Sequence, residues 1–291
     1  MSCYVHVGLG KSRSTFLKNV IFKEICKMVN FELLLSFPKK KLEGGNFLLS
    51  SEKLVGEFFE HKTTEQAANE TLKFFGKQAK IIIIIRRPID YFSSYFVEAH
   101  HGYKIVSEKQ FFKTEEEMKN SLPIDNYFAR YEKLNYPDLI KLYTDKFDNV
   151  YIIKYEDTKN LKIWSKVFNN KNIENIKFDN IYYNKGYSSF AIKLTQFFEK
   201  VLNIFGTNLF NLQNKVRQLP HVKFLPYKIK NRLAYELRWR FFIQNRFDKI
   251  FYNKKYIIKD KKIKNFLISK HDNFYYKYCS SFYEKGKQSI L

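Results

Sequence analysis

The sequence predicts an α/β fold with three layers, in which a central, mostly parallel sheet lies between helices. The first observation is the run Ile81–Ile85, which is far shorter than the roughly 20 apolar residues of a membrane span. A short β-branched run that stops abruptly is typical of a strand buried on both faces of a parallel sheet. The second observation is that strand-like and helical stretches alternate as far as Asp157, which indicates βαβ units.

Each predicted element rests on its own local pattern. The predicted strands are Cys3–Val7, Phe47–Ser50, Ile81–Ile85 and Val150–Tyr155. The first helix follows the loop Gly8–Thr15 and has a single apolar face, made of Leu17, Val20, Ile21, Ile25 and Met28. Further helices are expected at Thr64–Phe75 and from Pro88 to about His100.

The rest of the chain is expected to be less regular. Residues 104–122 are charged and mixed, which predicts a mobile surface segment, and a helical stretch opening at Pro123 is expected to be interrupted at Pro137. After Asp157 the pattern becomes helical and basic. We expect residues 1–205 to form the α/β core and residues 206–291 to form a basic helical extension packed on the same domain.

The charge of the chain favours anionic partners. The 291 residues carry a net charge of +23, and Lys215–Lys264 holds 16 Lys and Arg against three acidic residues. We expect this stretch to engage an anionic acceptor, such as an anionic glycan, or the surface of a membrane. The alternative is that its lysines are simply solvated and reflect the overall composition of the chain.

The cysteines indicate a reducing compartment. Cys3, Cys26 and Cys279 are odd in number, far apart and without metal-ligand spacing. We expect a cytoplasmic protein, with peripheral contact at the inner membrane face as an extension of that prediction, and no metal. The sequence shows neither the apolar core of a signal peptide nor a membrane anchor.

The loop Gly8–Thr15 joins a predicted strand to a predicted helix and combines glycines, a lysine and hydroxyls. Backbone N–H groups, a helix N-terminus and an ammonium group are what a bound phosphate or sulfate requires. A nucleotide kinase or NTPase would need the pattern G-x-x-x-x-G-K-[ST], but Val5 stands where its first glycine belongs. The isoleucine strand also ends in Arg86 and Arg87 rather than in a metal-binding aspartate, so a metal-dependent NTPase is disfavoured.

The end of the isoleucine strand predicts a second anion site. Arg86 follows the strand directly, and a helix is expected to begin at Pro88. Ligands of open α/β sheets bind where strands end and helices begin. Ser94 lies near the second turn of that helix, where its hydroxyl is expected to reach the same anion as Arg86.

Together these motifs resemble the sulfotransferases that use 3′-phosphoadenosine 5′-phosphosulfate (PAPS). The run His6–Leu17 resembles their P-K-[ST]-G-T-[TS]-x-L loop, and Arg86–Ser94 resembles their R-N-P-x-D-x-x-x-S motif. Weaker similarities follow in the same order at Phe47–Glu52, Tyr155–Asp157 and Asn184–Ser188. The resemblance covers about residues 3–205 and implies a P-loop-like fold.

The resemblance also implies roles for single residues. Lys11 is expected to stabilise the leaving phosphate oxygen, and the 5′ end of PAPS is expected to lie against Ser12, Arg13, Ser14 and Thr15. Arg86 and Ser94 are expected to hold the 3′-phosphate, with Lys185 completing that pocket. The chain departs from the family pattern at Gly10, where the family has proline, and at Arg87, where it has asparagine. At Arg13 the family has glycine, and the arginine either crowds the sulfate or adds a cation to it.

Sulfuryl transfer to a hydroxyl also needs a base. Glu52 falls at the position that the resemblance implies for this base, and its alternative role is to cap the next helix. His100 and His101 are rival bases, although adjacent histidines at a helix end are more often a cap or a surface pair. Asp90 is expected to satisfy the free amides at the start of its helix.

The predicted function is therefore transfer of the sulfuryl group of PAPS to a hydroxyl of a carbohydrate or of another small or cell-envelope acceptor, without a metal. The alternatives are a P-loop small-molecule kinase, a basic nucleic-acid-binding protein and a non-catalytic relative of the sulfotransferases. Nucleic acid is not the expected partner, because the basic residues are dispersed and the sequence contains no recognised binding module.

Overall fold

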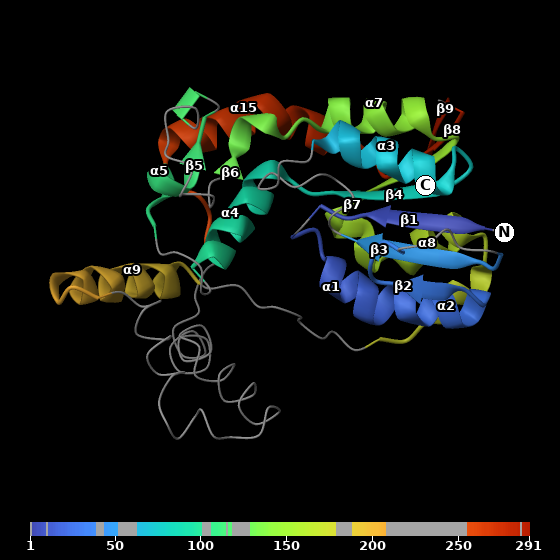
Figure 1. Cartoon of the computed structure of the whole chain (residues 1–291), viewed down its shortest axis with the longest axis horizontal. Helices are drawn as coiled ribbons and strands as arrows, with labels where there is room; N and C mark the ends of the chain where they lie inside the picture. The colour runs from blue at the N-terminus through green and yellow to red at the C-terminus, as the bar shows by residue number, and fades with distance from the viewer. Residues whose placement is uncertain are drawn as a thin grey trace, which may run out of the picture. The chain divides into compact units, whose positions relative to one another are not determined.

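The central sheet of the computed structural model is mostly parallel and has the isoleucine strand at its middle (Figure 1). The structure describes residues 2–9, 11–38, 44–51, 63–100, 106–114, 116–117, 129–178, 188–207, 255–285 and 287–291. Within these residues the strand order is β2-β3-β1-β4-β7-β8-β9. The strands are β1 (Cys3–Val7), β2 (Glu32–Leu34), β3 (Phe47–Ser51), β4 (Lys80–Ile85), β7 (Asn149–Lys154), β8 (Ser281–Glu284) and β9 (Lys287–Ile290). All neighbours from β2 to β7 pair in parallel, and β8 and β9 are antiparallel.

Helices cover both faces of this sheet. One face packs against the continuous helical segment of α1 (Ser14–Phe16), η1 (Leu17–Phe22) and α2 (Lys23–Val29), and against α8 (Leu161–Phe168). On the other face, α3 (Thr64–Phe75) packs against α7 (Tyr136–Lys146), which in turn packs against β7 (Figure 1). The predicted α/β architecture is confirmed, and Ile81–Ile85 are all fully buried.

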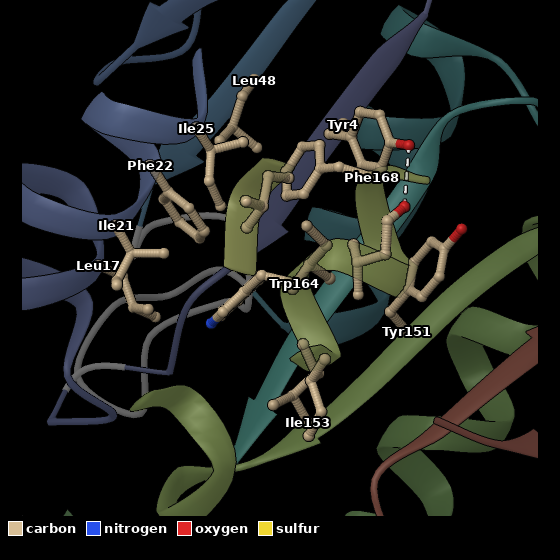
Figure 2. Packing of buried hydrophobic residues seen from close by; sticks show 14 of the residues in the cluster. Tyr4, Leu17, Ile21, Phe22, Ile25, Leu48, Tyr151, Ile153, Trp164 and Phe168 are labelled. Carbon is tan, nitrogen blue, oxygen red and sulfur yellow. Dashed lines mark hydrogen bonds between the residues drawn. The ribbon is translucent and has the colours of Figure 1, made fainter. Parts of the chain in front are cut away.

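The core between the sheet and α8 is built from large side chains (Figure 2). Trp164 is fully buried, and its ring meets that of Phe22 edge to face at 5.3 Å. Burying each such side chain contributes about 1.5–3 kcal/mol. The indole N–H also donates to the Thr158 carbonyl at 2.9 Å, so this core fixes the turn η4 (Tyr155–Lys159) that follows β7.

Local signals explain where the helices begin and end. Thr63 and Gln66 form a capping box at the start of α3, and the Asn135 side chain accepts from the backbone N–H of Asp138 in α7. Asn169 ends α8 in the left-handed conformation. The Tyr4 hydroxyl donates to the Val167 carbonyl at 3.0 Å, and so satisfies a carbonyl in the last turn of α8 (Figure 2).

The chain divides into two compact units that share helices. The first unit is Met1–Tyr91, Glu132–Tyr183 and Leu267–Leu291, and the second is Phe92–Tyr131 and Asn184–Phe266. Both α4 (Pro88–Ala99) and α15 (Lys261–Lys277) begin in one unit and end in the other. The units interleave along the sequence, and the boundary expected at residue 205 stays a prediction.

The second unit holds the remaining described elements. They are α5 (Glu108–Phe111), β5 (Phe112–Lys113), β6 (Ala129–Arg130) and α9 (Ser189–Ile204), while the 3₁₀ turn η3 (Tyr131–Lys133) begins in the second unit and ends in the first. The Glu108 carboxylate accepts hydrogen bonds from the backbone N–H groups of Lys259 and Asp260, at 2.9 and 2.6 Å, just before α15. A short 3₁₀ turn, η5 (Lys171–Asn175), belongs to the first unit. No helix within the described residues is long and apolar enough to cross a membrane.

Three sequence expectations need correction. Residues 106–114, expected to be mobile surface, form α5 and β5 and bury Phe111 and Phe112, because Ser107 and Gln110 supply a capping box just before these rings. Pro137 lies in the first turn of α7 instead of interrupting a helix, since proline has no N–H to lose there. A purely helical extension after residue 205 is not confirmed, because β8 and β9 continue the sheet beyond β7.

Removing the Tyr4 hydroxyl should destabilise the protein measurably. Tyr4→Phe leaves the Val167 carbonyl without its donor and also deletes an acceptor for Lys80 Nζ at 3.0 Å. We expect the free energy of unfolding in urea to fall by about 1–2 kcal/mol. The matched control is Tyr151→Phe in the same cluster, because the Tyr151 hydroxyl makes no hydrogen bond with the described residues. Equal effects of the two changes would contradict the capping role of Tyr4.

Candidate anion-binding site

The loop after β1, Gly8–Thr15, is called the anion loop below; Gly10 lies outside the described residues. It closes on the carbonyl of Leu9, which accepts the Ser12 N–H at 3.2 Å, the Ser12 hydroxyl and, at 3.5 Å, the Ser14 hydroxyl. Ser12 and Ser14 are buried, and the side chains of Lys11 and Thr15 are half-buried. In this structure the Ser12 hydroxyl therefore supports the loop itself.

The backbone of the anion loop adopts a conformation that non-glycine residues rarely take. Lys11 has φ 61° and Arg13 has φ 69°, both in the left-handed region. Such a residue costs roughly 1–2 kcal/mol, and this kind of strain is concentrated at functional sites. A left-handed residue followed by a right-handed one turns successive N–H groups toward the same side, which forms a concave anion-binding nest. Arg13 followed by the helical residue Ser14 has this pattern.

The helix that starts at Ser14 strengthens the same site. Its helical segments, α1, η1 and α2, follow one another without a break from Ser14 to Val29. Its N-cap residue, Arg13, makes no side-chain capping hydrogen bond. The N–H groups of the first turn and the positive end of the helix dipole therefore favour a bound anion beside the loop.

Arg86 joins the carboxyl end of β4 to the anion loop. Its guanidinium, in a residue only 6% exposed, donates to the Lys11 carbonyl at 2.6 Å. The Tyr136 hydroxyl fixes the Arg86 backbone, because it accepts the Arg86 N–H at 3.1 Å and donates to the Arg86 carbonyl at 2.5 Å. Burial raises the pKa of Tyr136, which keeps this hydroxyl protonated as a donor. Sequence reasoning did not identify Tyr136.

Arg13 and Arg86 lie over the same aromatic ring and are called the cation pair below. Their guanidinium carbons are 4.3 and 4.5 Å from the centroid of Tyr155, the first residue after β7. Arg13 also donates to the Thr158 hydroxyl at 2.9 Å and to the Tyr155 carbonyl at 3.3 Å. The arginine at the family's glycine position therefore anchors the anion loop to the turn η4.

The positive charge of the cation pair is not balanced by an ion pair with the described residues. Among the described residues, neither member of the cation pair forms an ion pair with a carboxylate. Arg87 differs, because it forms an ion pair with Asp272 through contacts at 2.5–3.2 Å, and this hydrogen bond raises the pKa of Arg87. A buried guanidinium without a counter-ion is costly, and a bound anion would remove that cost.

The acidic side chains nearest in sequence to Tyr155 bond to groups near the C-terminus. The Glu156 carboxylate accepts from the Tyr275 hydroxyl, and the Asp157 carboxylate accepts from the Ser280 hydroxyl at 2.5 Å. Burial and Glu156 both raise the pKa of Tyr275. These bonds join α15 and the residue before β8 to the turn η4, which follows β7. Sequence reasoning noticed Tyr155–Asp157 only as a landmark and gave these residues no role.

The structure describes only some of the other predicted site residues. Ser94 is half-buried on α4 in the second unit, so its approach to the same anion as Arg86 stays a prediction. Asp90 is the third residue of α4, as expected. Glu52, His101 and Lys185 lie outside the described residues. Within the described ranges no group of three or more His, Cys, Asp or Glu could hold a metal ion.

His100, a rival base, is a buried structural residue of the second unit. Its ring is 1% exposed, Nδ1 lies 2.8 Å from the Phe96 carbonyl, and Nε2 lies 3.4 Å from Gln196 Nε2. Burial lowers the pKa of His100 to about 4, although its backbone hydrogen bonds oppose the shift. The pair of bonds fits a neutral ring that donates from Nδ1 and accepts at Nε2.

These features define the class of the protein: an α/β protein with a candidate anion-binding loop at the carboxyl edge of a mostly parallel sheet. The site lies where neighbouring strands β1 and β4 end and their following helices begin, which is where such sheets bind ligands.

Comparison with known proteins adds one similar structure. No protein-family model matches the chain, and no curated protein matches it. A sulfotransferase from Alicyclobacillus acidocaldarius is similar to 68% of this chain and to 91% of its own, with 15% sequence identity and a TM-score of 0.42. Likeness at this level does not assign a function, which has to be argued from the site residues.

The left-handed conformation of Arg13 can be tested by comparing glycine with alanine. Both changes delete the guanidinium and its contacts, but only glycine adopts φ 69° without a steric penalty. We expect Arg13→Gly to have a free energy of unfolding about 1 kcal/mol higher than Arg13→Ala, measured by urea denaturation. The matched control is Lys23, an exposed helical residue. There the Lys23→Ala protein should be more stable than the Lys23→Gly protein by a similar amount. The same order at both positions would contradict the left-handed assignment.

Proposed function

We propose that this protein is a sulfotransferase that moves the sulfuryl group of PAPS to an acceptor hydroxyl. The observation that supports this most directly is the hydrogen bond from Arg86 to the Lys11 carbonyl, because it joins the two motifs that resemble the PAPS-binding motifs. These motifs are 75 residues apart in sequence, and the fold brings them together independently of the resemblance.

The chemistry of the site suits a nucleotide with phosphate groups at two positions. The anion loop offers backbone N–H groups and a helix N-terminus, which bind a phosphosulfate end. The Arg86 side chain makes one hydrogen bond with the described residues, so most of the donors of its planar fork remain for a second phosphate. The cation pair supplies positive charge that no carboxylate of the described residues neutralises.

Sulfuryl transfer resembles phosphoryl transfer, since an acceptor oxygen attacks in line while charge builds on the leaving bridging oxygen. Positioning and electrostatic stabilisation then provide most of the rate enhancement. In this proposal the Lys11 ammonium stabilises the leaving oxygen, and Ser14 and Thr15 hold the 5′ end. Glu52 takes the proton of the acceptor hydroxyl.

The kinase alternative is less well supported by the geometry of β1. A Walker-type loop would need a glycine at Val5, but Val5 is a fully buried residue within the strand. The proposed acceptor class, a hydroxyl on a carbohydrate or another small or cell-envelope molecule, is taken from the resemblance, and the net charge of +23 favours an anionic one. Most of the basic stretch Lys215–Lys264 lies outside the described residues, so its proposed contact with an anionic acceptor or membrane stays a prediction.

Ligand specificity tests the proposal directly. Adenosine 3′,5′-bisphosphate should raise the unfolding temperature without magnesium, because both phosphate sites are built from side chains and backbone. At about 100 times its dissociation constant it should add about 2.7 kcal/mol to the free energy of unfolding. AMP, which lacks the 3′-phosphate, should bind more weakly, and Arg86→Lys should bring the two affinities together because lysine lacks the planar fork.

The same measurement of the unfolding temperature is made with ATP plus magnesium and with a set of oligonucleotides. Equal stabilisation by AMP and the bisphosphate in the wild-type protein would contradict a 3′-phosphate site. Stabilisation by ATP with magnesium alone would favour the kinase, and stabilisation by oligonucleotides alone would favour a nucleic-acid-binding protein.

Kinetics should separate the roles of Lys11 and Glu52. Lys11→Ala should remove most turnover and weaken nucleotide binding, because it deletes the cation beside the leaving group. Glu52→Gln should lower kcat by about 10²–10⁴, the usual contribution of a general base, and leave nucleotide affinity nearly unchanged. Both are measured as sulfate transfer from PAPS to a panel of hydroxyl acceptors. Wild-type turnover in Glu52→Gln would place the base elsewhere, with His101 the next residue to replace.

A further inference from the structure

A fully buried histidine lies beneath the anion loop with one ring nitrogen unpaired. His6 is in β1, is 0% exposed, and its ring meets Phe22 edge to face at 5.2 Å. Its Nδ1 lies 2.7 Å from the hydroxyl of Ser50, its neighbour across β1 and β3. Its Nε2 is buried and has no hydrogen-bond partner among the described residues. A buried polar atom left unpaired destabilises a fold, so its presence needs an explanation.

The unpaired edge of the ring is turned toward the anion loop. A Cβ placed on Gly8 would lie 3.0 Å from His6 Cε1, 3.5 Å from His6 Nε2 and 3.1 Å from Ser14 Oγ. His6 Nε2 and Ser14 Oγ therefore both lie next to the position that a Cβ of residue 8 would occupy, and a larger residue there would crowd them. The hydroxyl of Ser14 is held weakly, since its bond to the Leu9 carbonyl is 3.5 Å long.

The protonation of the ring follows from its surroundings. Burial, with a smaller contribution from Lys18, lowers the pKa of His6 to about 3, so the imidazole is neutral at physiological pH. A neutral imidazole has one N–H donor and one acceptor nitrogen. If the Ser50 hydroxyl donates to Nδ1, the remaining proton is on Nε2, which is then a donor on the same side of Gly8 as the Ser14 hydroxyl.

We propose that His6 is a positioning residue for the anion loop: its Nε2–H donates to the Ser14 hydroxyl when that hydroxyl turns from the Leu9 carbonyl to a bound anion. This inference rests on the proposed binding of PAPS at the loop. In the anion-free state Nε2 has no hydrogen-bond partner among the described residues and Ser14 makes a long hydrogen bond. The chain of hydrogen bonds from Ser50 through His6 to Ser14 is therefore complete only with a ligand. The unpaired nitrogen thereby favours the ligand-bound state, because binding gives it a partner.

Two amide substitutions distinguish the two ring nitrogens. The side-chain N–H of glutamine in His6→Gln falls near the position of Nε2, whereas that of asparagine in His6→Asn falls near Nδ1. His6→Gln should therefore keep the affinity of the wild-type protein for adenosine 3′,5′-bisphosphate to within about twofold. His6→Asn should raise the dissociation constant about fivefold to tenfold, the usual worth of one hydrogen bond.

A third variant separates a positioning role from a purely structural one. His6→Phe keeps an aromatic ring against Phe22 and removes both nitrogens, so it should weaken binding as His6→Asn does. It should not lower the unfolding temperature of the ligand-free protein by more than His100→Phe, a buried control whose ring nitrogens both have neighbours. His100→Phe should leave affinity for the bisphosphate unchanged.

The binding measurements use isothermal titration with the full chain, adenosine 3′,5′-bisphosphate and AMP. Because Ser14 belongs to the 5′ end of the site, the loss in His6→Asn should be the same for both nucleotides. Failure of the wild-type protein to bind either nucleotide would overturn the proposed function itself. Normal binding by the wild type together with equal affinities for His6→Gln, His6→Asn and His6→Phe would overturn only the role of His6.

Discussion

The hydrogen bond between the Arg86 guanidinium and the Lys11 carbonyl is the contact on which the candidate site depends. It joins the loop after β1 to the end of the neighbouring strand β4. The Tyr136 hydroxyl also fixes the backbone of Arg86, because it bonds to both the N–H and the carbonyl of that residue. The position of Arg86 is set by the sheet, because Ile81–Ile85 are fully buried and pair with β7, and Ile81–Ile83 also pair with β1. Core packing therefore determines the geometry of a polar site. A change in the sheet register would move the arginine away from the loop.

The anion loop is held in a costly conformation by contacts made outside it. Lys11 and Arg13 both have left-handed backbone conformations. The hydrogen bonds to the Leu9 carbonyl and the contact of Arg13 with Thr158 offset the cost of these conformations. Thr158 is itself fixed by the indole of Trp164 in the core. In the proposed function, this arrangement prepares backbone N–H groups before the ligand binds, which reduces reorganisation when charge develops on the bound group.

The charge around the cation pair also depends on contacts with distant parts of the chain. Acidic residues are present close by in sequence, but Glu156 and Asp157 accept hydrogen bonds from Tyr275 and Ser280, and Asp272 pairs with Arg87. The C-terminal segment thus makes hydrogen bonds to Glu156 and Asp157 and forms an ion pair with Arg87. The uncompensated positive charge is a consequence of tertiary structure and not of net charge alone. The same segment extends the sheet through β8 and β9.

The sequence by itself determined the strands β1, β3, β4 and β7 and the helix starts at Thr64 and Pro88. These depend on local patterns, because burial on both faces selects β-branched runs and caps select particular residues. Tertiary structure alone decided the antiparallel strands at the C-terminus, the ring of Tyr155 under two arginines, and the unpaired nitrogen of His6. These contacts join residues far apart in the chain, so no local spacing encodes them. Whether a side chain meets a carboxylate, a ring or nothing depends on how the sheet and helices pack, and only the folded chain fixes that.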